Sequence, residues 1–205
     1  MLKSVSLNHQ YSAVKNESGM TSAYIFFLKL APLLGCYRRK FIARIISMSE
    51  NTNGIIRQLN SGEEIPYHLL LLADETIEAI DKYISTSEIY LLEQDDKMIA
   101  VYALWPLSKQ QIEIKNIAVH EDYQGRGIGR FLLKDAENKA KERGYREIII
   151  GTPDSAIKQL SIYKKAGFEE FSIKKDFFTL NYPQPIFEEG IQLKDMVMLR
   201  KKLIS

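Results

Sequence analysis

The chain has 205 residues, of which 45% are hydrophobic, and its formal net charge at neutral pH is +2. This length suits one domain of ordinary size, and the apolar fraction is high enough to form a core. The single cysteine, Cys36, excludes an internal disulfide and a zinc site built from several cysteines, so a cytoplasmic location is expected. The three histidines are scattered along the chain, and no metal site is expected.

The positive charge is concentrated at the N-terminus. Residues 1–50 contain seven Lys/Arg and two Asp/Glu, a net +5, so the other 155 residues carry 21 Lys/Arg and 24 Asp/Glu, a net −3. The main body of the chain lacks the basic stripe that is typical of nucleic-acid binders, and no nucleic-acid partner is expected.

Residues 1–50 are predicted to be a basic, partly apolar extension, and residues 51–205 to form one domain. The most apolar run, residues 23–36, is interrupted by Lys29 and Pro32 and is shorter than the roughly 20 apolar residues of a membrane-spanning helix. Three interpretations of the extension are open. Residues 33–36, LLGC, loosely resemble the lipobox of a bacterial lipoprotein signal, so the extension could be an export signal. The others are an amphipathic helix that contacts a membrane or a partner protein, and a dispensable segment before a translation start at Met48.

The first part of the predicted domain alternates between short strands and one helical region. Short apolar segments predict strands at residues 54–59, 87–94, 98–107 and 112–119. Residues 94–97 are predicted to form the turn between the second and third of these strands. The helical region covers residues 63–84, with a break near Ala73 and Asp74.

An amphipathic helix is predicted from Ile128 to Gly144. Apolar residues recur every four positions on one face, charged residues occupy the other faces, and Gly144 ends the helix. A β-branched strand follows at residues 145–151. Strand, helix and strand with short links predict a right-handed parallel crossover.

The last part of the chain is predicted to contain one helix and two strands. The helix covers residues 154–168, is capped by Asp154 or Ser155, and ends at Gly167. The strands cover residues 169–175 and 191–203, joined by residues 177–190. These elements predict an α/β (α+β) fold without a second domain.

Glycines stand at the entrance of the helix that begins at Ile128, although a glycine within a helix costs about 1 kcal/mol relative to alanine. The amides at a helix N-terminus lack partners and favour an anion such as a phosphate, and side chains would hold that anion away. The alternative is a turn that packs the helix tightly on the sheet. The turn contains three glycines and two arginines, Gly125, Gly127, Gly129, Arg126 and Arg130.

The longer context favours the phosphate interpretation. Residues 116–133, NIAVHEDYQGRGIGRFLL, resemble motif A of the GCN5-related N-acetyltransferases (GNATs), [QR]xxGx[GA], with Gln124, Gly127 and Gly129 at its defining positions. Residues 160–170, LSIYKKAGFEE, are similar to motif B, in which a helix carrying a tyrosine ends in a Gly-Phe pair. The resemblance covers about residues 54–203, and the C-terminal part resembles an uncharacterised bacterial subgroup.

The resemblance implies a GNAT fold, with a mixed central sheet of about six to seven strands, a splayed parallel pair and flanking helices. It also implies acetyl-CoA as co-substrate. The pantetheine arm would lie along Ile117, Ala118 and Val119, where a backbone amide would polarise the thioester carbonyl. The pyrophosphate would lie in the glycine turn, which comprises Gln124, Gly125, Arg126, Gly127, Ile128, Gly129 and Arg130.

Two catalytic residues are implied by the same resemblance. Tyr163 is the candidate general acid for the departing thiolate, and its alternative role is that of a packed aromatic. Glu113 matches the position of the catalytic glutamate in the histone-acetylating branch, and the alternatives are a solvated side chain beside Lys115 and deprotonation through a chain of waters. His120 is a weaker candidate base, because it lies at the exit of the strand toward the phosphates.

The second motif departs from the family at one position. Many relatives have an asparagine that contacts CoA where this chain has Ala156. The adjacent Ser155 could supply a hydroxyl to the cofactor instead, or serve only as the helix cap.

The expected acceptor is an amine of a small molecule or peptide. The segment of residues 176–195 combines Glu188, Glu189 and Asp195 with Tyr182, and together with Trp105 these groups suit a cation, although a solvated loop is equally consistent with them. Direct attack in a ternary complex is expected, because residues 51–205 contain no cysteine to carry the acetyl group. The alternative function is a non-catalytic acyl-CoA sensing module, and the oligomeric state is left open, with a homodimer as one option.

Overall fold

The computed structural model describes residues 54–203, so the predicted extension, residues 1–50, lies outside the described residues. The strands of the main sheet are β1 (Ile55–Gln58), β2 (Glu88–Gln94), β3 (Lys97–Pro106), β4 (Gln111–Val119), β5 (Glu147–Pro153), β6 (Glu169–Lys174) and β9 (Met196–Lys202). Two further strands form a small hairpin, β7 (Phe187–Glu188) and β8 (Ile191–Gln192). The helices are α3 (Tyr67–Leu70), α4 (Ile77–Asp81), α5 (Ile128–Glu142), α6 (Ile157–Lys165) and α7 (Phe177–Asn181), with short 3₁₀ helices η2 (Ile84–Thr86) and η3 (Glu121–Tyr123).

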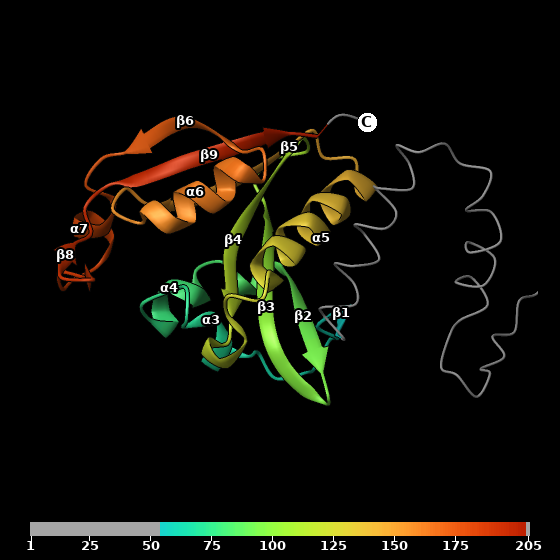
Figure 1. Ribbon diagram of the computed structural model, residues 1–205. Coiled ribbons are helices and arrows are strands. Elements are labelled where there is room, and N and C mark those ends of the chain that lie inside the picture. Colours follow the sequence, from blue (N-terminus) through green and yellow to red (C-terminus); the bar gives the residue numbers. More distant parts are fainter. Residues whose placement is uncertain (1–53, 204–205) are drawn as a thin grey trace, which may run out of the picture. The chain divides into compact units, whose positions relative to one another are not determined.

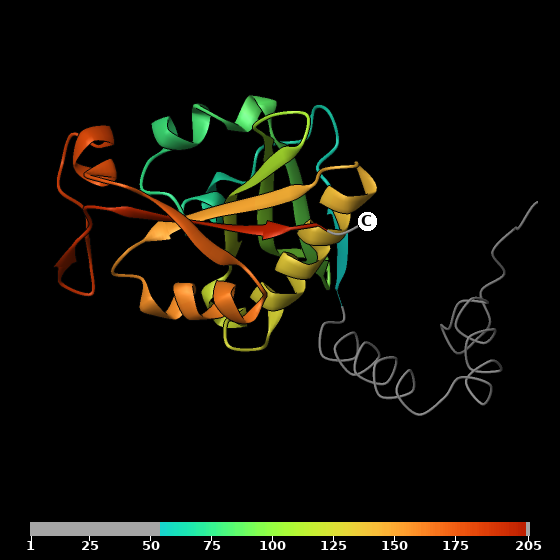
Figure 2. The ribbon, with the colours of Figure 1, turned by 90° about the horizontal axis from the view of Figure 1, so that it is seen from above.

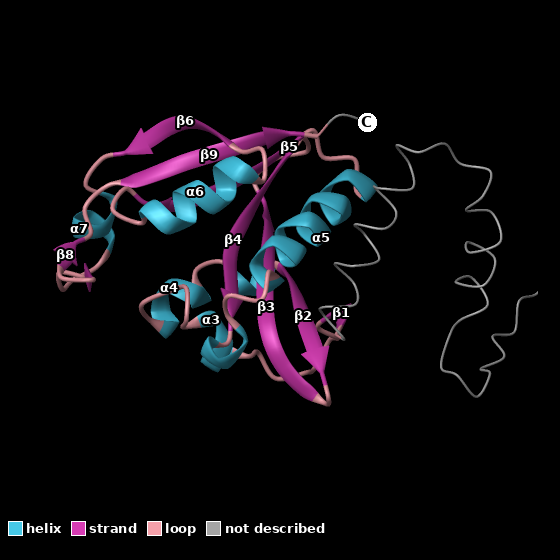
Figure 3. Cartoon of the chain, in the orientation of Figure 1, coloured by secondary structure: helices cyan, strands magenta, loops and turns pink. Residues whose placement is uncertain are grey.

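The main sheet has seven strands in the order β1-β2-β3-β4-β5-β9-β6, and β4 and β5 are its one parallel pair among the described residues. Helices α5 and α6 cover one face, whereas α3 and α4 lie on the other (Figures 1 and 2). Figure 3 shows this arrangement with the strands in magenta. The predicted mixed sheet with flanking helices and a parallel pair is therefore confirmed.

The β2–β3 hairpin follows from its turn. Asp95 and Asp96 both have positive φ, 51° and 58°, which matches the twist of the flanking strands. Side chains then alternate between the faces, so that Tyr90 and Leu92 contribute to the core under α5, and Leu91 to the core under α3.

Helix α5 forms because its apolar stripe meets the sheet. Ile128, Leu132, Ala136 and Ala140 are buried in the core that α5 shares with the sheet, and Gly144, with φ of 79°, follows the end of the helix. The prediction for this helix is confirmed. Within residues 54–203, no helix has the length and apolar character needed to cross a bilayer.

The helical region predicted at residues 63–84 is broken into α3, α4 and η2. The break near Asp74 was predicted, but the helices are shorter than expected. Asp74 turns inward at the break, where it accepts a hydrogen bond from the hydroxyl of Tyr83. This contact stabilises the turn between the short helices.

The predicted N-cap of the helix at residues 154–168 is wrong. Helix α6 begins after Ala156, and neither Asp154 nor Ser155 caps it. The amide of Ala156 donates to the carbonyl of Pro153, and the amide of Asp154 donates to the carbonyl of Asp195, so a turn held by backbone hydrogen bonds precedes the helix. Likewise, the strand predicted at residues 191–203 is divided into β8 and β9, and the predicted connection contains α7 and β7.

Candidate active site

The parallel strands β4 and β5 separate partway along their length. Their pairing runs from Gln111 opposite Glu147 to Ile114 opposite Ile150 and then stops. Beyond that point, β4 stays paired with β3 and β5 stays paired with β9. Figure 1 shows the two strands diverging. The opening leaves the backbone of residues 115–119 without a strand partner on the β5 side, which suits an extended ligand that adds to the strand.

A bulge in β4 lies at the start of the opening. Lys115 is an extra residue, because Ile114 and Asn116 lie opposite consecutive residues of β3. The bulge resets the alternation of side chains. Ile117 packs, like Ile114, against the core under α5, whereas Asn116 contacts α3. Polar and apolar side chains of the open segment therefore lie on opposite faces.

The glycine turn connects this strand to α5. Gly125 and Gly127 have φ of 75° and 83°, a left-handed conformation that favours glycine, and Gly127 is the N-cap of α5. The first backbone hydrogen bond into the helix runs from the amide of Phe131 to the carbonyl of Gly127, at 3.1 Å. The amides of residues 128–130 therefore lack partners within the helix and are available to an anion.

The fold does not require a glycine at position 129. Its φ lies outside the left-handed region, and a Cβ atom built on it would meet no heavy atom within 4 Å. The space beside Gly125 and Gly127 is equally open. Tight packing of the helix on the sheet thus does not explain these glycines. Positive φ accounts for Gly125 and Gly127, whereas neither packing nor backbone conformation accounts for Gly129.

Two side chains hold the turn in place. The Nε2 of Gln124 donates to the carbonyl of Val119 at 3.0 Å, which ties the end of β4 to the turn. The guanidinium of Arg126 donates to the carbonyl of Asp122 at 2.7 Å and lies 5.2 Å from the ring centroid of Tyr123. The remaining N–H groups of Arg126 are available to a phosphate.

The α6 region contributes two hydroxyls that have no partner in the described part of the chain. Tyr163 is buried in the core under α5, with its ring 6.4 Å from that of Phe168, and burial raises its pKa to about 12. The Oγ atom of Ser155 is also buried and accepts or donates no hydrogen bond. Tyr163 is thus packed in the core, and no hydrogen bond of its hydroxyl is formed within residues 54–203.

Glu113 is not the solvated residue considered from the sequence. It is buried, and its Oε1 lies 3.4 Å from the Nζ of Lys115. The same ammonium lies 5.4 Å from the ring centroid of Trp105 and 5.9 Å from that of Tyr83. Carboxylate and aromatic faces therefore surround an ammonium group on the α3 side of β4.

The sequence did not identify Asp74, Tyr83 and Asn116, which form a polar network beside the opening. The Oδ2 of Asp74 accepts from the hydroxyl of Tyr83 at 2.6 Å and from the Nδ2 of Asn116 at 3.1 Å. The same Nδ2 donates to the carbonyl of Leu70 at 2.9 Å. Burial raises the pKa of Asp74. No motif links these residues, because Asp74 and Asn116 are 42 positions apart.

Part of the C-terminal segment approaches this network. Burial, followed by the charges of Asp74 and Glu75, raises the pKa of Tyr182 to about 12. The pKa of Glu75 is raised by burial and by the charge of Glu188. Asp195 lies in a different environment, because it accepts from Lys175 at 2.5 Å and from the amide of Asp176. Among the acidic residues predicted in the segment of residues 176–195, Glu188 is placed near the network by its effect on Glu75.

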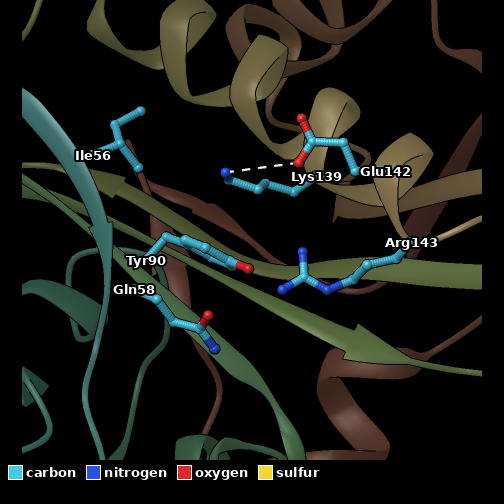
Figure 4. Close-up of a pocket in the computed structure, with 6 residues that line it drawn as sticks. All are labelled: Ile56, Gln58, Tyr90, Lys139, Glu142 and Arg143. Atoms are coloured by element: carbon cyan, nitrogen blue, oxygen red, sulfur yellow. Dashed lines mark ion pairs between the residues drawn. The ribbon is translucent and has the colours of Figure 1, made fainter. Parts of the chain in front are cut away.

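Two surface hollows lie away from the opening. One, of about 360 Å³, lies between β1, β2 and the C-terminal end of α5, and Figure 4 shows its lining residues. There Arg143 pairs with Glu88 at 2.7 Å, and Lys139 pairs with Glu142 at 3.9 Å. The other, of about 990 Å³, is lined by residues 108–111, 146–147 and 202–203, beside the paired end of β4 and β5. Neither hollow contains a residue of the predicted site.

Comparison with known proteins agrees with this geometry. A model of the acetyltransferase (GNAT) domain matches residues 85–170. The chain is 46% identical over 133 residues to the uncharacterized N-acetyltransferase YvbK of Bacillus subtilis (strain 168), covering 65% of this chain and 86% of that protein. The chain belongs to the GNAT family. Its recognition from the two motifs is thereby confirmed, and the protein is an N-acetyltransferase that uses acetyl-CoA.

Solved GNAT structures share the fold. A GNAT family acetyltransferase from Elizabethkingia anophelis with acetyl-CoA bound aligns with a TM-score of 0.72 and 46% identity, covering 74% of this chain and 99% of that one. A Bacillus subtilis acetyltransferase in complex with CoA aligns with a TM-score of 0.69 and 42% identity, over the same shares of the two chains. An IAA acetyltransferase from Bacillus cereus ATCC 14579 aligns with a TM-score of 0.70 and 39% identity, covering 73% and 99%.

Proposed function

We propose that this GNAT enzyme acetylates a primary amine by direct attack on acetyl-CoA in a ternary complex formed by residues 51–205. The observation that carries the proposal is Gly129. A Cβ atom at this position would meet no protein atom within 4 Å, so the fold does not require glycine there. The position lies beside helix amides that have no hydrogen-bond partner within the helix. The residues present therefore fit a diphosphate at the entrance of α5.

The other binding groups follow the same path. The pyrophosphate would accept from the amides of residues 128–130 and from the guanidinium groups of Arg126 and Arg130. The pantetheine arm would pair with the unpaired edge of β4 at residues 117–119. A β4 amide near Ile117 or Ala118 would donate to the thioester oxygen as negative charge develops there. The buried hydroxyl of Ser155 fits a polar contact with the cofactor.

The transfer then needs one bond to form and one to break. The amine nitrogen bonds to the acetyl carbon, the carbon–sulfur bond breaks, and the amine proton passes to a base. We propose that Tyr163 donates its hydroxyl proton, or a strong hydrogen bond, to the departing sulfur and recovers the proton from solvent. Its raised pKa keeps the hydroxyl protonated at neutral pH.

The nature of the acceptor is supported by one relative. The chain is 29% identical over 89 residues to the [ribosomal protein bS18]-alanine N-acetyltransferase of Escherichia coli (strain K12), covering 43% of this chain and 60% of that protein. That enzyme acts on a protein, as its name states. A peptide amine is therefore included with small amines among the acceptors proposed here.

The test is the release of free CoA thiol across a panel of amines, with CoA binding measured by calorimetry. We expect Tyr163→Phe to retain CoA affinity while turnover falls by about 10² or more, the scale of a lost general acid. Unchanged turnover would remove Tyr163 from the mechanism. CoA binding without thiol release for any amine would refute the transferase and favour the sensing module.

A further inference from the structure

Two carboxylates lie on the α3 side of β4, and either could receive the proton of the acceptor. An aliphatic ammonium with a pKa near 10 has to lose a proton before its nitrogen can attack. Glu113 belongs to β4 itself, whereas Asp74 belongs to the turn between α3 and α4. Their positions relative to the opening between β4 and β5 distinguish them.

Glu113 lies before the opening. It stands opposite Ile149, where β4 and β5 are still paired, and one more pair follows before the strands separate. Its side chain is 6% exposed and already has a cationic partner in Lys115. A second ammonium would have to displace the half-buried Lys115 to reach this carboxylate.

Asp74 reaches the open part of the strand. It is bonded to Asn116, which follows the bulge and precedes Ile117, where the thioester is proposed to lie. The hydroxyl of Tyr83 and the amide of Asn116 both donate to Oδ2, and the hydroxyl of Tyr182 also approaches the carboxylate. Oδ1 has two lone pairs and is therefore still able to accept from a ligand. In the described part of the chain, no Lys, Arg or His nitrogen lies within 4 Å of this carboxylate.

Asn116 provides an independent indication of a ligand. The residue is 3% exposed, and its Nδ2 is held by the acceptors Leu70 and Asp74, which fixes the orientation of the amide. Its Oδ1 is buried and has no donor among the described residues. A buried acceptor without a donor is rare in folded proteins. An ammonium group beside Asp74 has three N–H donors, more than the carboxylate alone requires.

The negative charges near Asp74 favour a cationic acceptor that carries no carboxylate of its own. Burial and then the charges of Glu188 and Asp74 raise the pKa of Glu75, and burial and then the charges of Asp74 and Glu75 raise the pKa of Tyr182, so negative charge is gathered near Asp74. Tyr83 and the ammonium of Lys115 approach from the other elements, and Lys115 is already paired with Glu113. Within residues 54–203, no group of three or more His, Cys, Asp or Glu side chains could hold a metal ion. The carboxylate of Asp74 and the buried amide oxygen of Asn116 suit the N–H donors of a cationic amine.

We propose that Asp74 is the catalytic residue that binds the acceptor ammonium and takes its proton, while Lys115 holds Glu113 in a fixed ion pair. This proposal rests on the transferase function proposed above. One N–H bond of the ammonium breaks toward Oδ1 of Asp74, and the electron pair left on nitrogen bonds to the acetyl carbon as the carbon–sulfur bond breaks. Asp74 passes its proton to solvent, and the second proton that nitrogen loses on becoming an amide also leaves to solvent. Tyr163 protonates the sulfur and recovers its proton from solvent, as proposed above. Burial brings the pKa of this carboxyl closer to neutral pH, which favours general base catalysis.

The experiment compares Asp74→Asn with Glu113→Gln in the full chain, using thiol release. The amine panel includes putrescine and 4-aminobutyrate, which share a primary amine and a four-carbon stem but end in an ammonium and a carboxylate. We expect putrescine to be preferred by about tenfold or more. Near neutral pH, Asp74→Asn is expected to lower turnover by about 10² and to regain activity above about pH 9, where solvent deprotonates the amine.

Glu113→Gln is expected to lose less than about tenfold and to keep the pH dependence of the parent. Thermal unfolding and CoA affinity, each close to that of the parent, establish that both variants are folded. The proposal is overturned if Asp74→Asn keeps turnover within about threefold, or if Glu113→Gln is the variant whose activity recovers at high pH. If the parent protein releases no thiol with any amine of the panel, the transferase function itself fails, and this proposal fails with it.

Discussion

Replacing Gly129 with alanine is expected to change stability and cofactor affinity in opposite directions. Gly129 is the second residue of α5, its φ lies outside the left-handed region, and the added Cβ meets no heavy atom within 4 Å. Alanine is favoured over glycine in helices by about 0.5–1 kcal/mol. For a domain of this size, that gain raises the melting temperature of the ligand-free protein by about 1–4 °C.

The same methyl group is expected to weaken CoA binding. It would project into the space beside the amides of residues 128–130, where the diphosphate is proposed to lie. Loss of one hydrogen bond to a charged group costs about 1.5–3 kcal/mol, which corresponds to roughly 10- to 150-fold in affinity. A more stable protein that binds its cofactor less well is an outcome that general damage to the fold cannot produce.

Thermal unfolding without ligand and calorimetric titration with CoA measure the two effects separately. Gly144→Ala is the matched control, because Gly144 follows the other end of α5 with φ of 79°. The control is expected to lose stability and to keep its CoA affinity. If Gly129→Ala raises the melting temperature and leaves CoA affinity unchanged, the amides at the entrance of α5 do not bind the diphosphate, and the reasoning is wrong.

Two further predictions concern buried polar groups. Ser155→Ala removes a hydroxyl without a partner, so the free energy of unfolding should change by less than about 0.5 kcal/mol, while CoA affinity by calorimetry falls about threefold to tenfold. A larger loss of stability would show that the hydroxyl has a structural partner. Burial alone would raise the pKa of Glu137, but Lys141 and Lys201 hold it at about 2. Because this folded-state pKa lies below the ordinary value of 4.5, the stabilisation is present above pH 4.5 and is lost as pH falls toward 2. Urea unfolding should show Glu137→Gln about 1.5–3 kcal/mol less stable at neutral pH, with a flatter dependence below pH 4.5, and parallel pH curves for variant and parent would contradict this.

The elements that the sequence predicts well are those determined by local pattern. The stripe of α5 repeats over four turns and is followed by Gly144, so both its face and its end can be read from neighbouring residues. The β2–β3 turn is similar, because Asp95 and Asp96 lie between two apolar segments of strand length. Motif A is also local, since its glycines and the amides they expose lie within one turn of chain.

The helical region before β2 could not be predicted in the same way. Its apolar run suits a continuous helix, but Asp74 is held by Tyr83 and by Asn116, which is 42 positions away. Contacts at such separation override helix propensity and leave no periodic signal. The start of α6 was missed for a related reason, because backbone hydrogen bonds, including one from Asp154 to Asp195, replaced the expected side-chain cap.

The candidate site divides along the same line. The proposed cofactor side rests on two motifs, each a continuous stretch of sequence, and the open space beside Gly129 is consistent with the first. The proposed acceptor side draws on the α3–α4 turn, β3, β4 and the C-terminal segment, where the sequence analysis named only Trp105, Glu113, Tyr182 and Glu188. Asp74 belongs to no sequence motif, and its burial depends on the fold as a whole.

The extra residue in β4 lies where the opening between β4 and β5 begins. A bulge bends and twists its strand, and this one occurs where the parallel ladder to β5 ends. A chain lacking Lys115 would keep every neighbouring side chain on its present face, yet the straightened strand would be free to continue its ladder toward Pro153. The opening between β4 and β5 would then close, although no other residue of either strand had changed. One inserted residue in β4 would thus be sufficient to keep the two strands apart.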